Sequence, residues 1–414
     1  MKTVLKHRLF FLMAFGVSKA IVFLAPLLLS NTLSKTNYGV LEYALNIAFI
    51  GAAIINFGVP NAYPYFKLKR KFQAIYTGFN FHFLYLLASS FFALISIFIF
   101  RNETQFVLSV LFIYTLSNQV TYSLRYKTDE KIIKAVFVDA LFYVVLLCAY
   151  FYIYLTDDSS IEPITYGAFL YSIIYMIIAL KKGYKLQIKA AFKKHQKLIK
   201  YGKSVMLSGL FILLIANSGR IVIDLVFNDK ELIAIFGFYF RMASFVVMLH
   251  QILNIIYFKR IYTFNTQKLD TIFVVFLSII ALGVAATYFI IPKIGIHFFK
   301  LFETFPIYKD VYLVLCFQMI FWIVLANNEN VIYREKLASK MNIAFTLLLT
   351  FFAVTVTLLK DTFNFNDVVI GLYLLIVTAV TLQFYILYKF KKIKLKKTIV
   401  ASVLVFLLSL ILII

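Results

Sequence analysis

The 414-residue sequence contains few charged residues, only two cysteines, and few glycines and prolines. Charged residues make up 14% of the chain and hydrophobic residues 63%, whereas soluble proteins contain about 45–50% apolar residues. Long uncharged runs recur from end to end, and runs of about 18 or more apolar residues are typical of membrane-spanning helices. The composition therefore excludes an ordinary soluble domain and predicts an all-α polytopic membrane protein.

The positions of the two cysteines and the lack of catalytic motifs give no sign of redox, metal or enzymatic chemistry. Cys148 and Cys316 both lie in apolar segments, so a CxxC pair, a zinc site and a disulfide framework are excluded. The sequence also lacks a GxSxG motif, a P-loop, an HExxH motif and the paired aspartates of a nucleotide-sugar site. We expect no metal, no cofactor and no enzymatic activity.

Acidic residues are scarce as well, with 18 Asp and Glu against 42 Lys and Arg and a formal net charge of +24. In a soluble protein this charge would indicate nucleic acid. Here the excess lies in short loops between apolar runs, where the positive-inside rule explains it. A cytoplasmic N-terminus leaves seven Lys and Arg on the outer side and three, Lys19, Arg220 and Arg241, inside spans. The charge bias therefore predicts a multi-pass protein with a cytoplasmic N-terminus and no nucleic-acid partner.

The apolar runs predict thirteen spans, and the last of them is short enough to be an interfacial tail instead. A basic linker follows the sixth span, and a weak repeat with an offset of 198 residues aligns Gly39 with Gly237 and Asn56 with Asn254. This pattern favours a parallel duplication. We expect a six-helix bundle at 1–180, a cytoplasmic linker at 181–202, a second six-helix bundle at 203–390, and a basic stretch with the thirteenth helix at 391–414. The predicted spans are residues 9–32, 38–61, 72–100, 104–125, 132–155, 163–180, 203–227, 231–258, 270–291, 309–328, 341–359, 366–389 and 398–414.

Two basic residues lie deep in predicted spans. Lys19 and Arg241 are each about ten residues from a span end, or roughly 15 Å at 1.5 Å per residue. A cation at the bilayer centre costs about 2.5–3.5 kcal/mol unless it faces protein or water. We expect both to line a central cavity, where Arg241 binds a phosphate bidentately and Lys19 acts as a point charge. The alternative is ion pairing with Glu42 or Asp139, or snorkelling.

Further polar residues in the spans are candidates for substrate binding or ion coupling. Arg220 and Asp224 share a helical face, and Asn217 extends it, so these residues indicate either a binding surface or a simple helical ion pair. Asp139 and Asp224, together with Glu42, are the candidates for ion coupling or charge pairing. His82 and Gln119 are expected to form hydrogen bonds between helices.

Pro26 follows Lys19 on the same face of the first predicted helix. A proline removes one backbone hydrogen bond and kinks a helix. The outer part of this helix is therefore a candidate gate.

Three stretches carry a resemblance to a known family. Residues 24–66 read LAPLLLSNTLSKTNYGVLEYALNIAFIGAAIINFGVPNAYPYF, residues 217–245 read NSGRIVIDLVFNDKELIAIFGFYFRMASF, and residues 328–342 read NENVIYREKLASKMN. They resemble the Wzx-type O-antigen and capsule flippases of the multidrug/oligosaccharidyl-lipid/polysaccharide (MOP) exporter superfamily. The family usually has an acidic residue before the arginine, where this chain has Gly219, with Asp224 one turn later. That departure puts an acidic coupling role near Arg220 in doubt.

The resemblance implies two pseudo-symmetric six-helix bundles around a central cavity, as in MATE-like transporters. It also implies a flippase in the bacterial inner membrane that moves an undecaprenyl-pyrophosphate-linked oligosaccharide between leaflets by alternating access. The implied partners are membrane lipids, a proton or sodium ion, and a polysaccharide polymerase with its chain-length machinery. Another MOP transporter, either a peptidoglycan-precursor flippase or a cation-coupled drug exporter, is the alternative. A polysaccharide polymerase is disfavoured because the predicted outer loops are short.

Overall fold

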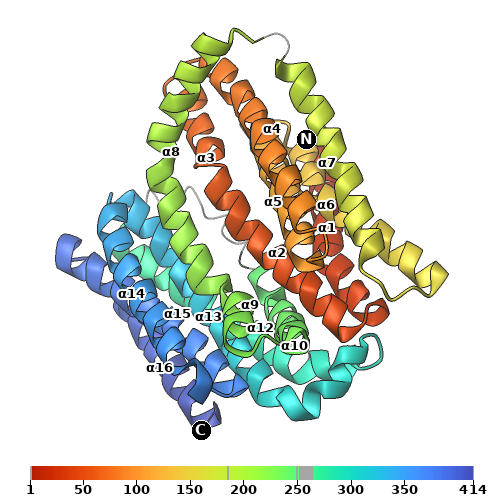
Figure 1. Cartoon of the computed structure of the whole chain (residues 1–414). Helices are drawn as coiled ribbons and strands as arrows, with labels where there is room; N and C mark the ends of the chain where they lie inside the picture. The colour runs from red at the N-terminus through yellow and green to blue at the C-terminus, as the bar shows by residue number, and fades with distance from the viewer. Residues whose placement is uncertain (1, 184–185, 249, 251–263, 414) are drawn as a thin grey trace. The chain divides into compact units, whose positions relative to one another are not determined.

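A computed structural model of the chain describes residues 2–183, 186–248, 250 and 264–413. Every regular element in these ranges is helical (Figure 1). Twelve of the described helices are long and apolar enough to cross a membrane. The predicted all-α polytopic fold is thereby confirmed, with a span number inside the expected range.

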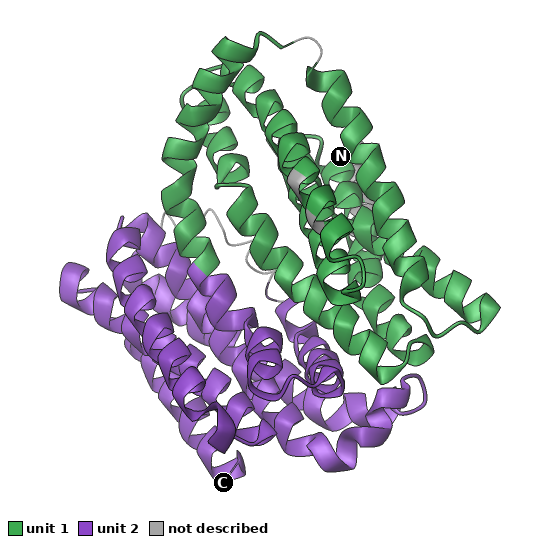
Figure 2. Cartoon of the chain, viewed as in Figure 1, with its two compact units in different colours: residues 1–210 green, residues 211–414 purple. Residues whose placement is uncertain are grey.

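The helices form two compact units, residues 1–210 and 211–414 (Figure 2). Helix α8 begins in unit 1 and ends in unit 2. The described elements of unit 1 are α1 (Lys2–Thr32), α2 (Lys35–Ile55), α3 (Val59–Pro64), the π-helix η1 (Tyr65–Lys69), α4 (Ile75–Ile99), α5 (Thr104–Thr128), α6 (Ile132–Thr156), α7 (Glu162–Gly183) and the first part of α8 (Ile188–Asn217). Those of unit 2 are α9 (Gly219–Phe227), α10 (Lys230–Ala243), α12 (Thr266–Gly295), η2 (Lys300–Thr304), α13 (Phe305–Arg334), α14 (Ala338–Leu359), η3 (Lys360–Thr362), α15 (Phe365–Lys391) and α16 (Lys396–Ile413).

Helix α5 is the central helix of unit 1, where it packs against α2, α3, α4, α6 and α7. It is the least apolar of the twelve candidate spans and yet one of the two most buried. Several of its polar side chains form hydrogen bonds inside the protein: Thr115 and Ser117 donate to carbonyls three or four residues back, and Gln119 bonds to the backbone of α6. Lipid offers no hydrogen bonds, so the polar composition places this helix in the interior.

Helix α13 has the same role in unit 2, where it packs against α10, α12, α14, α15 and α16. The start of α16 is held against α12 by Asp270, a buried residue of α12. Its carboxylate accepts hydrogen bonds from the backbone N–H groups of Lys397 and Thr398, both at 2.9 Å, and from the Thr398 hydroxyl at 2.7 Å. A carboxylate at a helix N-terminus is favoured by the free N–H groups and the helix dipole. Residues 396–413 thus form a docked helix long enough to be the thirteenth predicted span.

The structure corrects the boundaries predicted for the seventh span. The seventh was expected at 203–227, but α8 starts at Ile188, inside the predicted linker, and ends at Asn217. Asn217, Ser218 and Gly219 are poor helix formers, and the helix breaks there before α9 begins. For the eighth span, expected at 231–258, α10 covers Lys230–Ala243 and residues 245–248 are helical again after a turn at Ser244. Residues 249 and 251–258 lie outside the described residues, so the end of this span stays a prediction.

The lysine-rich start of α8 is an amphipathic helix rather than an irregular linker. Ala191, His195, Leu198 and Gly202 are all buried, whereas the lysines at 193, 197, 200 and 203 are exposed. The buried positions recur every three or four residues, which is the spacing of one helix face. The period-3.6 stripe was visible in the sequence, but the lysines around it favoured a linker.

Two pairs of close backbone contacts hold this face of α8 against unit 1. Gly58 has a φ of 68°, and a Cβ on it would strike the carbonyl group of Gly202. A Cβ on Gly78 would lie 2.7 Å from the carbonyl carbon of Lys194 and 2.8 Å from the backbone nitrogen of His195. Glycine at these positions lets α8 approach the α2–α3 junction and α4 at backbone contact.

Candidate substrate-binding site

Lys19 lies on α1, toward the N-terminal end of the span Met13–Thr32. The rotation of α1 is set by the neighbouring Ser18, whose hydroxyl donates to the Val136 carbonyl on α6 at 2.9 Å. The Lys19 ammonium is 5.5 Å from the centre of the Phe15 ring. Among the described residues no carboxylate lies within 4.0 Å of this ammonium. Lys19 is therefore a partly buried cation whose charge is not neutralised by a direct ion pair.

Asp139, on α6, is paired with a different lysine. Its carboxylate is 2.8 Å from the Lys127 ammonium, and both side chains are more than one third exposed. The pairing that was the alternative to ion coupling is thus present. The ion pair accounts for the position of Asp139. Because exposed ion pairs contribute about 0–1 kcal/mol, it adds little to the stability of the fold.

Glu42 and Pro26 are both buried in unit 1. The Glu42 side chain has no exposed surface and accepts a hydrogen bond from the Tyr38 hydroxyl at 3.0 Å. Asn46, also buried, follows one turn later on α2. Helix α1 is continuous through Pro26. The gating role of Pro26 and the coupling role of Glu42 stay predictions.

The candidate residues of unit 2 surround the break between α8 and α9. The Arg220 guanidinium is buried, approaches the Gly237 carbonyl on α10 at 3.5 Å, and lies 5.0 Å from the centre of the Phe240 ring. A desolvated cation over an aromatic face gains about 2 kcal/mol. Asp224 is paired with Lys230 across the α9–α10 turn. Arg220 and Asp224 are both on α9, as the four-residue spacing predicts, whereas Asn217 is the last residue of α8; its place on their face stays a prediction.

Arg241 lies in the last turn of α10, two residues before that helix ends. A cation near a helix C-terminus is favoured by the helix dipole, and the Ser244 hydroxyl donates to the Arg241 carbonyl at 2.8 Å. Lys19 belongs to unit 1 and Arg241 to unit 2. Their joint action on one anion stays a prediction.

A buried hydrogen-bonded chain joins α2, α4, α5 and α8 in unit 1. His82 places Nε2 2.9 Å from the Asn56 Oδ1 and Nδ1 3.0 Å from the His195 Nε2. Because the amide oxygen can only accept, His82 donates from Nε2 and accepts at Nδ1 from His195. The Thr121 hydroxyl donates to the same Asn56 oxygen at 3.1 Å. The interhelical role predicted for His82 is confirmed, whereas His195 was not recognised because it lies in the stretch taken for a linker.

Replacing His82 with alanine is expected to destabilise the protein by about 2 kcal/mol, because it leaves the buried His195 Nε2 without its acceptor and removes one of the two donors to the Asn56 oxygen. The measurement is the thermal unfolding midpoint of the purified protein in detergent. His297→Ala is the matched control, since His297 is exposed. Equal midpoints for the two variants would contradict a structural role for the chain of hydrogen bonds.

A second buried group in unit 1 is basic and aromatic. The Lys182 ammonium lies 3.6 Å from the centre of the Phe83 ring and 3.8 Å from that of Tyr122. The Lys182 Nζ, the Tyr122 hydroxyl and the Arg125 Nε are buried without a hydrogen-bond partner among the described residues. Arg125 also lies 4.9 Å from the centre of the Tyr76 ring. Arg125 is neutralised in part, because its Nε lies 3.8 Å from the Asp129 carboxylate and its Nη2 donates to the Tyr76 hydroxyl. Among the described residues Lys182 is thus the cation of this group without a carboxylate within 4.0 Å, and its ammonium and the Tyr122 hydroxyl are donors without an acceptor, which is an environment that favours an anion.

Sequence reasoning missed this group because both cations were counted as loop charges. Helix α5 continues to Thr128 and α7 to Gly183, three residues beyond each predicted end. The additional turn of α7 places Lys182 on a helix, whereas Arg125 is the last residue of the predicted span 104–125 and was counted with the loop that follows it. Tyr122 and Arg125, three residues apart and so on one helix face, were the available signal.

Comparisons with known proteins establish the fold. A search of family models found no match to the sequence, and a search of curated proteins found none either. Among solved structures, the chain is similar to one described as the lipid II flippase MurJ in an inward closed conformation, with a TM-score of 0.67 and 15% sequence identity. The similarity covers 97% of this chain and 92% of that chain. The protein is therefore a multi-pass α-helical membrane protein with a MurJ-like fold throughout nearly its whole length.

Proposed function

We propose that the protein is a flippase that moves an anionic lipid-linked saccharide precursor from the inner to the outer leaflet of the bacterial cytoplasmic membrane. The observation that carries this proposal is the MurJ-like fold over 97% of the chain. The solved protein is described as a lipid II flippase. A shared fold by itself leaves the substrate open, so the charges in the interior must supply the remaining support.

Basic groups dominate the candidate site, which favours an anionic substrate. Lys19 is a partly buried cation without a direct carboxylate partner, and Arg220 is buried over aromatic rings. Lys182 adds a cation to the interior of unit 1, between two aromatic rings. A diphosphate-linked glycan crossing about 30 Å of hydrocarbon needs such groups to replace its hydration. A drug exporter for cationic substrates would need carboxylates instead.

Within this class we favour an undecaprenyl-pyrophosphate-linked oligosaccharide, the O-antigen, capsule or exopolysaccharide unit that the resemblance to Wzx-type flippases implies. The second candidate is a peptidoglycan precursor, and the name of the solved structure favours it. Both share the polyprenyl diphosphate and differ in the attached group. Membrane lipids surround either substrate. A polysaccharide polymerase with its chain-length machinery would receive the undecaprenyl-pyrophosphate-linked oligosaccharide and not the peptidoglycan precursor.

Ion coupling is the part of the proposed cycle for which Glu42 is best placed. Asp139 and Asp224 are each engaged in an ion pair with a lysine. Glu42 is fully buried in a membrane-spanning helix and bonded by a tyrosine hydroxyl. Ionisable groups at such positions commonly bind protons or cations in transporters, so we assign the proton or sodium coupling to Glu42.

The proposal is tested by reconstituting the full-length protein into vesicles with a fluorescent polyprenyl-diphosphate saccharide in both leaflets. A membrane-impermeant reagent that quenches the outer leaflet reports on transfer over time. We expect rapid loss of the protected fraction with the protein and none in empty vesicles. A peptide-free saccharide and one that carries a pentapeptide separate the two candidates. Transfer of neither substrate under an imposed proton or sodium gradient would overturn the proposal.

A further inference from the structure

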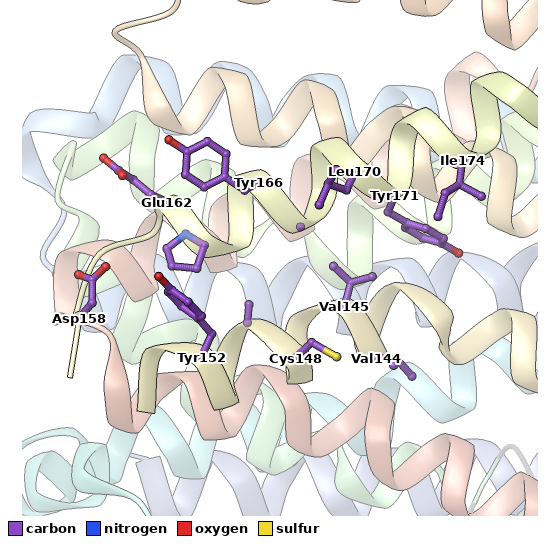
Figure 3. A pocket seen from close by; sticks show the side chains of 13 residues that line it. Val144, Val145, Cys148, Tyr152, Asp158, Glu162, Tyr166, Leu170, Tyr171 and Ile174 are labelled. Carbon is purple, nitrogen blue, oxygen red and sulfur yellow. The ribbon is translucent and has the colours of Figure 1, made fainter. Parts of the chain in front are cut away.

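A groove lies between α6 and α7 in unit 1, outside the candidate site (Figure 3). Its volume is about 540 Å³, and its lining is mainly apolar. Gly167 lets α7 approach α6 closely on the groove wall, because a Cβ there would lie 3.0 Å from the Val145 Cγ1. Cys148, Leu170 and Ile174 line the groove and are exposed. Both helices are candidate spans, so this groove faces the surroundings of a membrane helix rather than a packed interior.

One end of the groove is acidic. Figure 3 shows Asp158 and Glu162 together at the end where α7 begins, with Tyr152 and Tyr166 beside them and the aliphatic side chains farther along. Asp158 accepts hydrogen bonds from the backbone N–H and the hydroxyl of Ser160, each at 2.9 Å. No lysine or arginine among the described residues lies within 4.0 Å of either carboxylate. The chain has more than twice as many basic as acidic residues, and yet two carboxylates at this end of the groove have no basic side chain beside them. Their charge favours a cationic ligand.

The order of the groups along the groove matches a phospholipid. The carboxylates lie at the helix ends, where the headgroups of a bilayer are, and the aliphatic lining extends from there into the hydrocarbon. Tyrosines are typical of the boundary between the two regions, and they lie between the acidic and aliphatic parts. Two carboxylates attract an ammonium group and repel a phosphate with no positive partner. An anionic lipid is therefore disfavoured at this rim.

We propose that the groove binds a phospholipid with a primary-ammonium headgroup, of the phosphatidylethanolamine class. Its ammonium lies between Asp158 and Glu162, and the upper part of one acyl chain packs along Val145, Cys148 and Leu170. The charge bias predicts that this end of α6 faces the outer leaflet. The site is independent of the proposed transport activity, since it uses none of the candidate substrate-binding residues.

The native cysteines provide the test. Cys148 lines the groove and is exposed, whereas Cys316 is buried, so a maleimide reagent reacts at the groove in the unmodified chain. The full-length protein is placed in nanodiscs of phosphatidylglycerol alone or of phosphatidylglycerol mixed with phosphatidylethanolamine of the same acyl chains. We expect phosphatidylethanolamine to slow the labelling of Cys148 about two- to fivefold, the range expected for exposed charge pairs.

Charge variants in the same loop show whether the carboxylates select the headgroup. Asp158→Asn with Glu162→Gln is expected to remove the difference between the two lipid mixtures. Asp157→Asn is the matched control, because Asp157 is exposed, precedes Asp158 and does not line the groove; it is expected to keep the difference. Equal labelling in both mixtures for the native chain, or a difference that survives the double substitution, would overturn the proposal. Stronger protection by a polyprenyl phosphate than by phosphatidylethanolamine would also overturn it, and would assign the groove to the substrate's lipid tail.

Discussion

Replacing Lys19 and Arg241 together with alanine is expected to slow the transfer of a polyprenyl-diphosphate saccharide about a hundredfold or more. Each charge-assisted hydrogen bond to a phosphate contributes about 1.5–3 kcal/mol, and every 1.4 kcal/mol is about tenfold in rate or affinity. The loss arises because the diphosphate would enter the membrane interior without cations to replace its hydration. The vesicle transfer assay, with equal amounts of reconstituted protein, measures this loss.

Three controls make the result specific to substrate binding. Lys35→Ala removes an exposed lysine at the start of α2 and is expected to leave transfer unchanged. Arg241→Lys keeps the charge but loses the bidentate fork, so an intermediate rate is expected. A double-mutant cycle then asks whether the two residues contact one anion: a joint site gives a non-additive loss. Additive effects, or unchanged transfer in the double variant, would show that Lys19 and Arg241 do not form a common site. If the double variant still transferred the substrate, the common site would be contradicted and the proposed flippase function would stand.

Gly58→Ala is expected to destabilise the protein by about 3 kcal/mol or more. The backbone of Gly58 is left-handed, which costs an alanine about 1–2 kcal/mol. The added Cβ would also strike the Gly202 carbonyl group, and backbone cannot move aside as a flexible side chain can. Overpacking of this kind costs about 1–3 kcal/mol. The unfolding midpoint in detergent and the yield of monodisperse protein are the measurements.

Gly209→Ala is the matched control for Gly58→Ala and for the α8 contact. Gly209 lies on α8 seven residues after Gly202, and a Cβ there meets no atom within 4 Å. Alanine favours a helix over glycine by about 0.8–1.0 kcal/mol, so this variant is expected to be neutral or slightly more stable. If both variants had the same stability, the backbone contact between Gly58 and Gly202 would not be a constraint on the fold.

The region around α8 shows where reading the sequence was limited. The eight lysines at 181–202 favoured a cytoplasmic linker, and the predicted helix started fifteen residues too late. The buried stripe through His195 and Gly202 has a helical period, but its meaning depends on a partner surface. That surface is the α2–α3 junction and α4, and it exists only after the first helices have packed. The same dependence hid Lys182, whose ammonium lies between rings from two other helices.

The sequence by itself determined that the chain forms a polytopic helical bundle. Long apolar runs, loop charges and the position of Lys19 within an apolar run are local properties, so they can be read directly from the sequence. Only the tertiary structure decided which polar groups meet: His82 with His195, Asp139 with Lys127, and Asp270 with the start of α16. It also decided that two carboxylates share the rim of an apolar groove. Such contacts depend on the rotation of each helix about its axis, and that rotation is set by packing against all of its neighbours.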